Sequence, residues 1–272
     1  MCGVSLDHAH GYNNRLVVTK RDRSGTVRRR AVPFSFMTTF HVISLFPESL
    51  DSYVNSSILK RAQERGIIAV KYYNPRDFAK SAKYDAKAAA KMTYAERRVD
   101  DRPYGGGPGM VMEALPVIRA IENAVGKKIK GKMSRKVKII FFSPSGKKFS
   151  NVVADSIRKY TDIVLVCGRY EGIDARVKKA FPMTDISVGD YVLTGGELPA
   201  MIVIDTITRR IPGVLGDDTS VEERRVAGSD VYTRPEIIEY KGKKLRVPKV
   251  LLSGHHKKMD EWKMKGKSEK TK

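Results

Sequence analysis

Short apolar runs alternate along the chain with segments in which apolar residues recur every three or four positions. The first run covers residues 40–46 and the second covers residues 67–73, the length and composition of buried strands. In the segment between them, apolar residues recur at helical spacing, at Leu50, Tyr53, Val54, Ile58 and Ala62. Gly66 would end this helix. A strand, a helix and a second strand in this order predict a parallel pair joined by a right-handed crossover.

The same alternation continues to about residue 211. The further predicted elements are strands at 137–142, 162–167 and 186–188, and helices at 112–125, 151–160, 174–180 and 198–211. Ser150 or Asn151 is placed to cap the helix that starts near residue 151. Strands that alternate with helices in this way predict an α/β fold with one parallel sheet.

Polar loops that contain glycine follow three of the predicted strands, at 143–146, 168–172 and 189–196. Because the carboxyl ends of parallel strands meet at one edge of a sheet, we expect these loops to lie together. Such an edge is where α/β proteins hold small molecules, and glycines let a ligand approach the backbone. No Gly-x-Gly-x-x-Gly turn follows a strand, which disfavours a dinucleotide site of the Rossmann type.

A segment rich in glycine and proline precedes the helix predicted at 112–125. Residues 100–110 hold four glycines and two prolines, beside Asp100, Asp101, Arg102 and Tyr104. These charged and aromatic neighbours are unlike a neutral flexible linker, so we interpret the segment as a loop whose backbone approaches another group. It is not a P-loop, because no Gly-Lys-Ser/Thr sequence ends it.

The net charge of the chain indicates the kind of partner. The chain has 272 residues, with 52 Lys and Arg against 30 Asp and Glu, a formal net charge of +22 and a pI near 9.9. An excess of this size favours nucleic acid as a partner, because each neutralised phosphate releases counterions. The alternative is a soluble basic protein whose tails raise the count.

Cysteine content and hydropathy indicate the compartment. Cys2 and Cys167 are too few for a disulfide framework or a cysteine-based metal site, and we predict no metal ligands. No apolar run reaches the roughly 18 residues of a membrane helix, and the N-terminus lacks the apolar core of a signal peptide. We therefore expect a reducing, cytoplasmic environment and no membrane partner.

Composition divides the chain into four parts. Residues 1–36 lack sustained periodicity and are rich in arginine, which predicts a disordered basic extension that contacts RNA, or a start codon misassigned upstream of Met37. Residues 37–214 would form the α/β domain and residues 215–231 a polar linker, before a small basic domain at 232–272.

Within the small basic domain we expect an extended segment at 245–252 and a polar, Lys-rich tail from residue 260. His255 and His256 lie in a basic turn between them. Adjacent side chains point apart on a helix or a strand, so a helix cap or phosphate contacts suit this pair better than a metal ion.

A set of segments points to one family. They are 43–48 (Ile-Ser-Leu-Phe-Pro-Glu), 75–78 (Pro-Arg-Asp-Phe), 99–110, 143–144, 166–174, 189–200, 209–216, 232–236 and 250–254. Each segment is weak evidence alone, but together, in this order and spacing, they are specific. From about residue 39 to residue 263 the chain resembles the bacterial tRNA (guanine-N1)-methyltransferase family, TrmD.

The resemblance implies a SPOUT-type α/β domain with a parallel sheet and a trefoil knot in its carboxyl half, followed by a small, mainly helical C-terminal domain. It implies that the knot loops bind S-adenosylmethionine and that a homodimer shares each active site between its subunits. The substrate would be N1 of the guanine immediately 3′ of the anticodon, so the anticodon arm of tRNA is the expected partner. The basic domain at 232–272 is expected to bind this arm. The resemblance also suggests a need for Mg²⁺.

Motif matching assigns the site residues. The expected cofactor contacts are Phe142, Ser143, Pro144, Gly168, Tyr170, Glu171, Val188, Gly189, Asp190, Tyr191, Val192, Leu193, Gly195, Gly196 and Pro199. Arg209 matches the arginine that would stabilise negative charge on guanine O6, and Arg210 beside it is expected to be a solvated helix end. The family has an aspartate as general base where this chain has Arg224, which cannot accept a proton. A shift of one residue puts Glu223 in that role, and Glu222 is the second choice.

Two other functions stay open at this point. A related SPOUT enzyme would act on ribosomal RNA, and a dimer without a working base would bind RNA without catalysis.

Overall fold

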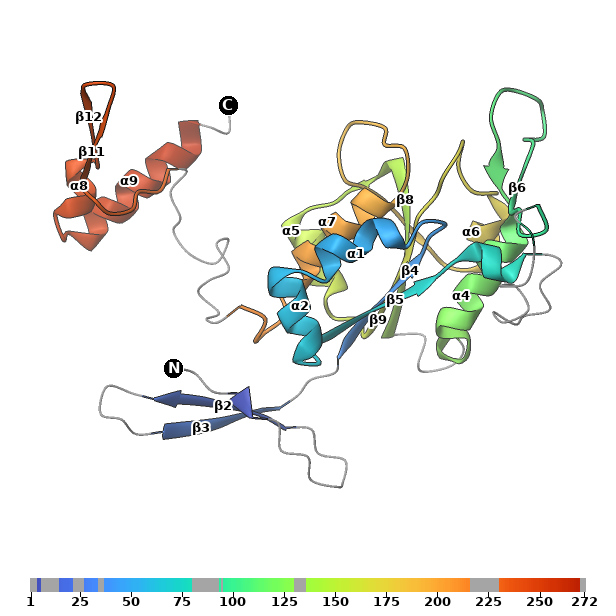
Figure 1. Ribbon diagram of the computed structural model, residues 1–272, viewed down its shortest axis with the longest axis horizontal. Coiled ribbons are helices and arrows are strands. Elements are labelled where there is room, and N and C mark those ends of the chain that lie inside the picture. Colours follow the sequence, from blue (N-terminus) through green and yellow to red (C-terminus); the bar gives the residue numbers. More distant parts are fainter. Residues whose placement is uncertain are drawn as a thin grey trace. The chain divides into compact units, whose positions relative to one another are not determined.

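The computed structural model describes residues 37–79, 93, 95–129, 136–215 and 230–269, and before residue 37 only the backbone of three short strands. For residues 127–129 and 265–269 it likewise describes the backbone alone. The chain divides by its internal contacts into two compact units, residues 1–214 and residues 215–272 (Figure 1).

A five-stranded sheet forms the centre of the first unit, in the order β10-β8-β9-β4-β5. The strands are β4 (Thr38–Ile43), β5 (Ile68–Tyr73), β8 (Val137–Lys148), β9 (Asp162–Val166) and β10 (Thr184–Ser187). Each strand runs parallel to its neighbours. Every residue of β4 and β9 is buried, as expected for central strands that are covered on both faces. The predicted α/β fold with a parallel sheet is confirmed.

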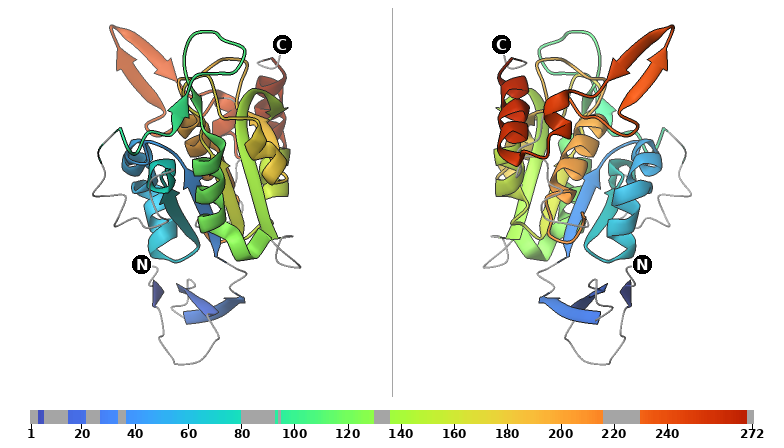
Figure 2. Two further views of the ribbon diagram at one scale, coloured as in Figure 1. Left: turned by 90° about the vertical axis from the view of Figure 1, so that its right-hand side faces the viewer. Right: turned by 90° about the vertical axis from the view of Figure 1, so that its left-hand side faces the viewer.

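Helices cover both faces of this sheet (Figure 2). On one face lie α4 (Ala114–Ile129) and α6 (Arg176–Ala180), and on the other α1 (Glu48–Val54), α2 (Ser57–Glu64), α5 (Asn151–Ile157) and α7 (Glu197–Thr208). A short 3-10 helix, η1 (Pro75–Phe78), follows β5. Val117 and Ile121 of α4 share a fully buried cluster with Val166 of β9. Among the described residues, no helix is long and apolar enough to cross a membrane.

The single helix predicted between the first two strands is in fact two helices. α1 ends at Val54 and α2 begins at Ser57, whose φ of 45° is far from helical. Leu50 and Val54 before the break and Leu59 and Ala62 after it are all buried. The apolar spacing therefore continues across the break, and periodicity alone did not reveal it.

Residues 143–146, predicted to be a loop, lie inside strand β8. The pairing of β8 with β10 jumps from Phe141–Asp185 to Lys147–Ile186, so residues 142–146 have no partner in β10 and form a bulge. A bulge is one of the few places where a sheet accepts proline, which explains Pro144 within a strand. The bulge still delivers Ser143 and Pro144 to the carboxyl edge of the sheet.

The glycine-rich segment closes a small hairpin made by β6 (Asp100–Asp101) and β7 (Val111–Met112). Its four glycines all have positive φ, between 79° and 111°, which side chains rarely adopt. The hairpin is fastened to the loop after β9, because Met112 N donates to Gly172 O and Asp174 N donates to Met112 O, both at 3.0 Å. Only the end of the segment makes the predicted close approach: Glu171 N donates to Met110 O at 3.0 Å, and a Cβ on Gly109 would lie 2.7 Å from the Glu171 side chain. A Cβ on any of the residues 105–107 would meet nothing within 4 Å.

Residues 1–36, predicted to be a disordered extension, contain three strands. The backbones of β1 (Val4–Ser5), β2 (Arg15–Arg21) and β3 (Val27–Pro33) pair antiparallel in the order β1-β2-β3. The sequence did not predict these strands because closely spaced arginines interrupt the apolar alternation. A role of this segment in RNA contact stays a prediction.

The second unit consists of a hairpin and two helices: β11 (Ile237–Tyr240), β12 (Lys243–Arg246), α8 (Lys249–Leu252) and α9 (His256–Glu269). The prediction of an extended segment at 245–252 is wrong for its second half, because residues 249–252 form α8. The predicted tail from residue 260 belongs to α9 as far as residue 269. Of the linker predicted at 215–231, residues 216–229 lie outside the described residues.

Two glycine substitutions test how closely β8 and β10 pack. A Cβ on residue 146 would lie 2.6 Å from the backbone nitrogen of Ile186, so Gly146→Ala should cost about 1–3 kcal/mol of folding free energy. A Cβ on residue 126, in α4, would meet nothing within 4 Å, so Gly126→Ala should stabilise by about 0.5–1 kcal/mol. Urea unfolding measures both, and equal stability of the two variants would contradict the described packing.

Candidate active site

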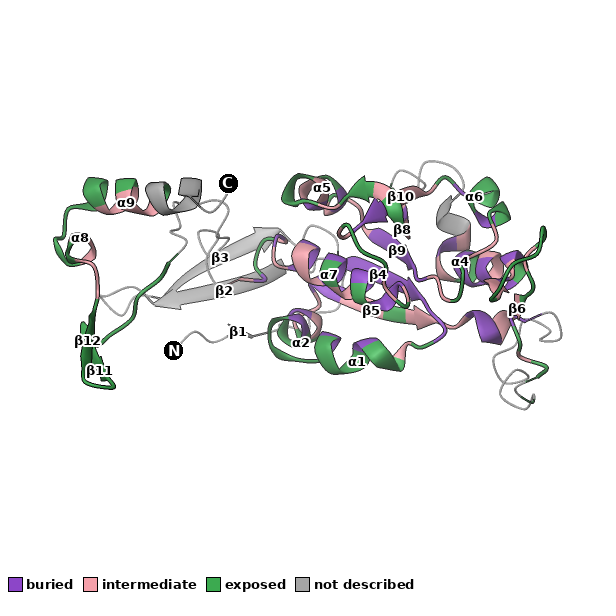
Figure 3. Cartoon of the chain, turned by 90° about the horizontal axis from the view of Figure 1, so that it is seen from above, coloured by how far each residue is buried: buried purple, intermediate pink, exposed green. Residues whose placement is uncertain are grey.

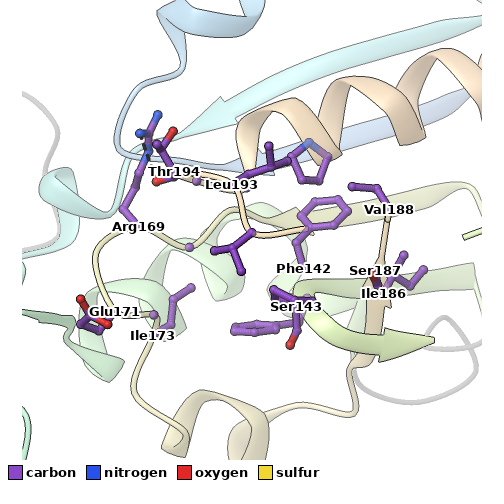
Figure 4. Close-up of a pocket in the computed structure, with 18 of the residues that line it drawn as sticks. Phe142, Ser143, Arg169, Glu171, Ile173, Ile186, Ser187, Val188, Leu193 and Thr194 are labelled. Carbon is purple, nitrogen blue, oxygen red and sulfur yellow. Dashed lines mark hydrogen bonds between the residues drawn. The ribbon is translucent and has the colours of Figure 1, made fainter. Parts of the chain in front are cut away.

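A pocket of about 480 Å³ opens at the carboxyl edge of the sheet (Figure 4). Its walls come from residues 141–144 of β8, where the bulge begins, from the loop at 168–173 after β9, and from residues 186–196 at the end of β10 and beyond it. Pro199, in the first turn of α7, completes it. The three segments predicted from glycine and polar composition therefore do meet at one place.

All residues predicted to contact a cofactor line this pocket except Asp190. The Asp190 side chain is 85% exposed and its carboxylate pairs with Lys148 Nζ at 2.8 Å. That hydrogen bond raises the pKa of Lys148. Asp190 is therefore engaged at the surface, although both of its sequence neighbours line the pocket.

Arg169, Gly172 and Thr194 also line the pocket and belong to the loops that were predicted to meet here. The lining residues that the sequence did not predict are Phe141, Ile173, Ala175, Lys178, Ile186 and Ser187. Most of them lie between or beside predicted residues, so extending each motif to the whole loop would have included them. Lys178 is different, because it comes from α6. Its Nζ lies 4.2 Å from the centre of the Phe141 ring and 2.5 Å from Asp185 Oδ2. Only the tertiary fold brings it to the pocket.

One buried carboxylate ties the pocket segments together. The Glu197 side chain is 4% exposed, at the N-terminus of α7, and its Oε2 lies 3.0 Å from Arg169 Nε in the loop after β9. Its other oxygen, Oε1, accepts a hydrogen bond of 2.6 Å from Ser44 Oγ, just beyond β4. The ends of β4 and β9 and the start of α7 are thus fixed to one group.

Arg169 is held on further sides. Its guanidinium lies 4.8 Å from the centre of the Phe46 ring, and its Nη1 donates to Thr194 O at 3.4 Å. Figure 4 shows Arg169 beside Thr194 at one end of the pocket, with Glu171 next to Ile173 elsewhere along the wall. A cation with ion-pair, ring and carbonyl contacts has little freedom to move.

The double glycine before Glu197 makes this arrangement possible. A Cβ on Gly195 would lie 2.5 Å from both Arg169 Nε and Glu197 Oε2, inside the ion pair. A Cβ on Gly196 would lie 2.5 Å from the Cα of Cys167, where Gly196 N donates to Gly168 O at 3.0 Å. Any side chain at either position would push the segment before α7 away from the end of β9.

Cys167 follows the last residue of β9, lies against Gly196 and is fully buried. Burial, and then the negative charge of Glu197, raises the pKa of the Cys167 thiol well above its ordinary value. The thiol is therefore protonated at neutral pH and is not a nucleophile. In the described part of the chain, no group of three or more His, Cys, Asp or Glu side chains is placed to hold a metal ion.

Of the predicted catalytic residues the structure places only Arg209, which does not line this pocket. Arg209 follows the last turn of α7, ten residues after Pro199, or about 15 Å along the helix axis. Arg210 is buried rather than solvated, because its Nη1 reaches Asp155 Oδ2 of α5 at 2.8 Å. Glu222, Glu223 and Arg224 lie outside the described residues.

A parallel α/β sheet that holds a glycine-lined pocket at its carboxyl edge defines the class of cofactor-binding α/β enzymes. Comparison with known proteins is more specific. The family described as tRNA (Guanine-1)-methyltransferase TrmD matches residues 38–272. The chain belongs to this family, and its first unit has the SPOUT-type α/β fold.

Individual relatives agree with this assignment. The tRNA (guanine-N(1)-)-methyltransferase of Clostridioides difficile is 43% identical over 227 residues, which cover 82% of this chain and 89% of that relative. The one from Carboxydothermus hydrogenoformans is also 43% identical, over 82% of this chain and 80% of the relative. Among solved structures, the tRNA (m1G37) methyltransferase of Aquifex aeolicus matches with a TM-score of 0.65 and 35% identity, over 86% of this chain and 91% of that one.

Glu197→Gln tests the buried ion pair. Glutamine can still accept from Ser44 but leaves Arg169 without its counter-charge, so we expect a loss of about 2–3 kcal/mol of folding free energy. Lys148→Gln is the matched control, because it breaks the exposed Lys148–Asp190 pair and should leave stability unchanged. Chemical unfolding of the two variants compares them, and a Glu197→Gln protein as stable as the control would refute the role given to this carboxylate.

Proposed function

We propose that this protein transfers a methyl group from S-adenosylmethionine to N1 of the guanine immediately 3′ of the anticodon in tRNA. Membership in the TrmD family supports the reaction, and the Aquifex aeolicus relative is named for guanine 37 of tRNA. The pocket where the segments after β8, β9 and β10 meet is the observation that carries the proposal for this chain. A net charge of +22 suits an RNA substrate.

The pocket fits S-adenosylmethionine in size and in chemistry. Its volume of about 480 Å³ is in the range of small-molecule sites. Phe142, Ile173 and Leu193 offer apolar contacts for a purine ring, and the glycine backbones leave donors and acceptors open to its polar edges. The cofactor would supply a methyl group bonded to a positively charged sulfur. We assign its binding to the predicted residues that line the pocket, without Asp190.

The reaction requires a base and a source of positive charge. A bond forms between guanine N1 and the methyl carbon while the bond from that carbon to sulfur breaks and leaves its electron pair on sulfur. Glu223, or Glu222 as second choice, would take the N1 proton. Arg209 would stabilise the negative charge that develops on O6 as that proton leaves.

Two subunits are needed if Arg209 acts at this pocket. In its own chain Arg209 lies at the far end of α7, about 15 Å along the helix from Pro199. It follows Leu198 and Ile202 at helical spacing on one face, where these two side chains are 53% and 40% exposed. Tyr53 of α1 is also half exposed and forms a hydrogen bond with Asp205 of the same face. An exposed apolar face that carries Arg209 supports a homodimer with shared active sites.

Some features implied by the family stay predictions. They are the trefoil knot, the need for Mg²⁺ and the cytoplasmic location. A related enzyme that acts on ribosomal RNA is the alternative that the following assay excludes or supports.

A methyl-transfer assay tests the function. The purified protein, a labelled methyl donor and tRNA transcripts with guanine or adenine 3′ of the anticodon are incubated together, with ribosomal RNA as a second substrate. We expect label on the guanine transcript only, in the form of 1-methylguanine. Label on the adenine transcript or on ribosomal RNA would sink the assignment, and tight tRNA binding without label would favour a non-catalytic RNA binder.

Mixing two inactive variants tests the shared site. Arg209→Ala removes the proposed cation, and Ser143→Trp fills the pocket, so each variant alone should be inactive. Unfolding and refolding them together should restore about a quarter of wild-type activity, because half of the dimers are mixed and each has one intact site. No recovery, with mixed dimers demonstrated by differential tags, would place the whole site within one chain.

A further inference from the structure

The hairpin of the second unit has a tight turn and exposed strands. β11 and β12 pair antiparallel from Ile237–Arg246 to Tyr240–Lys243, and the two residues between them, Lys241 and Gly242, have φ of 50° and 74°. Positive φ at both positions is the geometry of a type I′ turn, which suits the twist of a tight hairpin. Every residue of both strands is exposed, and Figure 3 shows the whole hairpin in the colour of exposed residues.

The two faces of this hairpin differ in chemistry. Directly opposed residues share a face, so Ile238 and Leu245 lie with Tyr240 and Lys243 on one face, which we call the tyrosine face. The other face has the pairs Ile237–Arg246 and Glu239–Lys244, and the charges of the second pair are 3.9 Å apart. The tyrosine face therefore has a cation and three apolar or aromatic side chains, and no acid.

The tyrosine face is uncovered within the second unit. Ile238 is 52% exposed, Tyr240 61% and Leu245 49%. A two-stranded hairpin is at best marginally stable by itself in water, so one with no buried residue gains from a surface that covers it. These side chains do not contribute to the core of the unit, which leaves contact with a partner as their use.

The charge of the hairpin identifies the partner. Residues 237–246 contain four Lys and Arg and one Glu. Lys241 Nζ at the turn lies 5.4 Å from the centre of the Tyr240 ring, so a cation and an aromatic ring stand together at the tip. Lysines bind phosphates, and an exposed tyrosine stacks on a nucleobase or packs on a ribose. RNA offers both groups within one nucleotide.

We propose that the tyrosine face of this hairpin docks on the tRNA substrate, with Lys241 and Lys243 on backbone phosphates and Tyr240 against a base or sugar. The inference rests on the proposed function, since that supplies tRNA as the partner. The proposal distinguishes the two faces of the hairpin. The tyrosine face contacts RNA, and the face with the Glu239–Lys244 pair remains in solvent.

Matched single substitutions test which face of the hairpin contacts RNA. Lys243→Gln and Lys244→Gln each remove one positive charge from adjacent residues, but from opposite faces. Lys243→Gln should weaken tRNA binding about three- to ten-fold and reduce the slope of log Kd against log salt by about 0.7–0.9, the value for one phosphate contact. Lys244→Gln should change tRNA binding less than about two-fold, within the effect of an unspecific surface charge.

The ring is tested in the same way. Tyr240→Ala should weaken tRNA binding several-fold, and Tyr240→Phe should retain it, because stacking needs the ring and not the hydroxyl. S-adenosylmethionine binding, measured by calorimetry, and the dimeric state, measured by light scattering, should not change in any of the four variants. Since all of these side chains are exposed, the substitutions leave the fold intact.

Two results would overturn the inference while leaving the methyltransferase assignment in place. Equal effects of Lys243→Gln and Lys244→Gln on tRNA binding would show a diffuse charge effect without a docking face. A change in oligomeric state with unchanged tRNA binding would show that the tyrosine face covers a second protein chain. If the wild-type protein bound no tRNA at all, the proposed function would fail instead.

Discussion

The carboxylate of Glu197 is buried at the point where the end of β4, the loop after β9 and the start of α7 meet. It accepts from Ser44 Oγ and is paired with Arg169, so one charged group fixes three segments that are far apart in sequence. A buried carboxylate without this hydrogen bond and this counter-charge would be strongly destabilising, so the three segments are held close to it. The pocket is made largely of the loops that this group holds in place.

The glycines around this junction follow from the same constraint. Gly195 leaves room for the ion pair, and Gly196 lets the chain pass against Cys167 at the end of β9. Arg169 is thereby held at the wall of the pocket that we propose for the methyl donor. The architecture also explains the separation of roles along α7, whose first turn forms the pocket while Arg209 follows its last turn. In the homodimer that we propose, such a helix would contribute to two different sites.

Local signals in the sequence were sufficient for the sheet and for most of the pocket. Apolar runs such as 162–167 predicted the buried strands, and glycines at 168, 189 and 195 marked the loops that meet at the sheet edge. Interactions between distant segments were not predictable in this way. The partners of Glu197 are more than 25 residues away, Lys178 reaches the pocket from a separate helix, and the β8 bulge depends on its register with β10. The hairpin at 237–246 was not predicted, because its two four-residue strands, IIEY and KKLR, show no alternation of apolar and polar residues.

A crystal structure of the protein with S-adenosylmethionine would locate the cofactor and its contacts. We expect the cofactor in the pocket between Ser143, Gly168 and Leu193, with Arg169 still paired to Glu197 and with Arg209 of a second subunit facing the methyl group. A cofactor bound at any other place, or bound here with the Arg169–Glu197 pair broken, would contradict the proposed site.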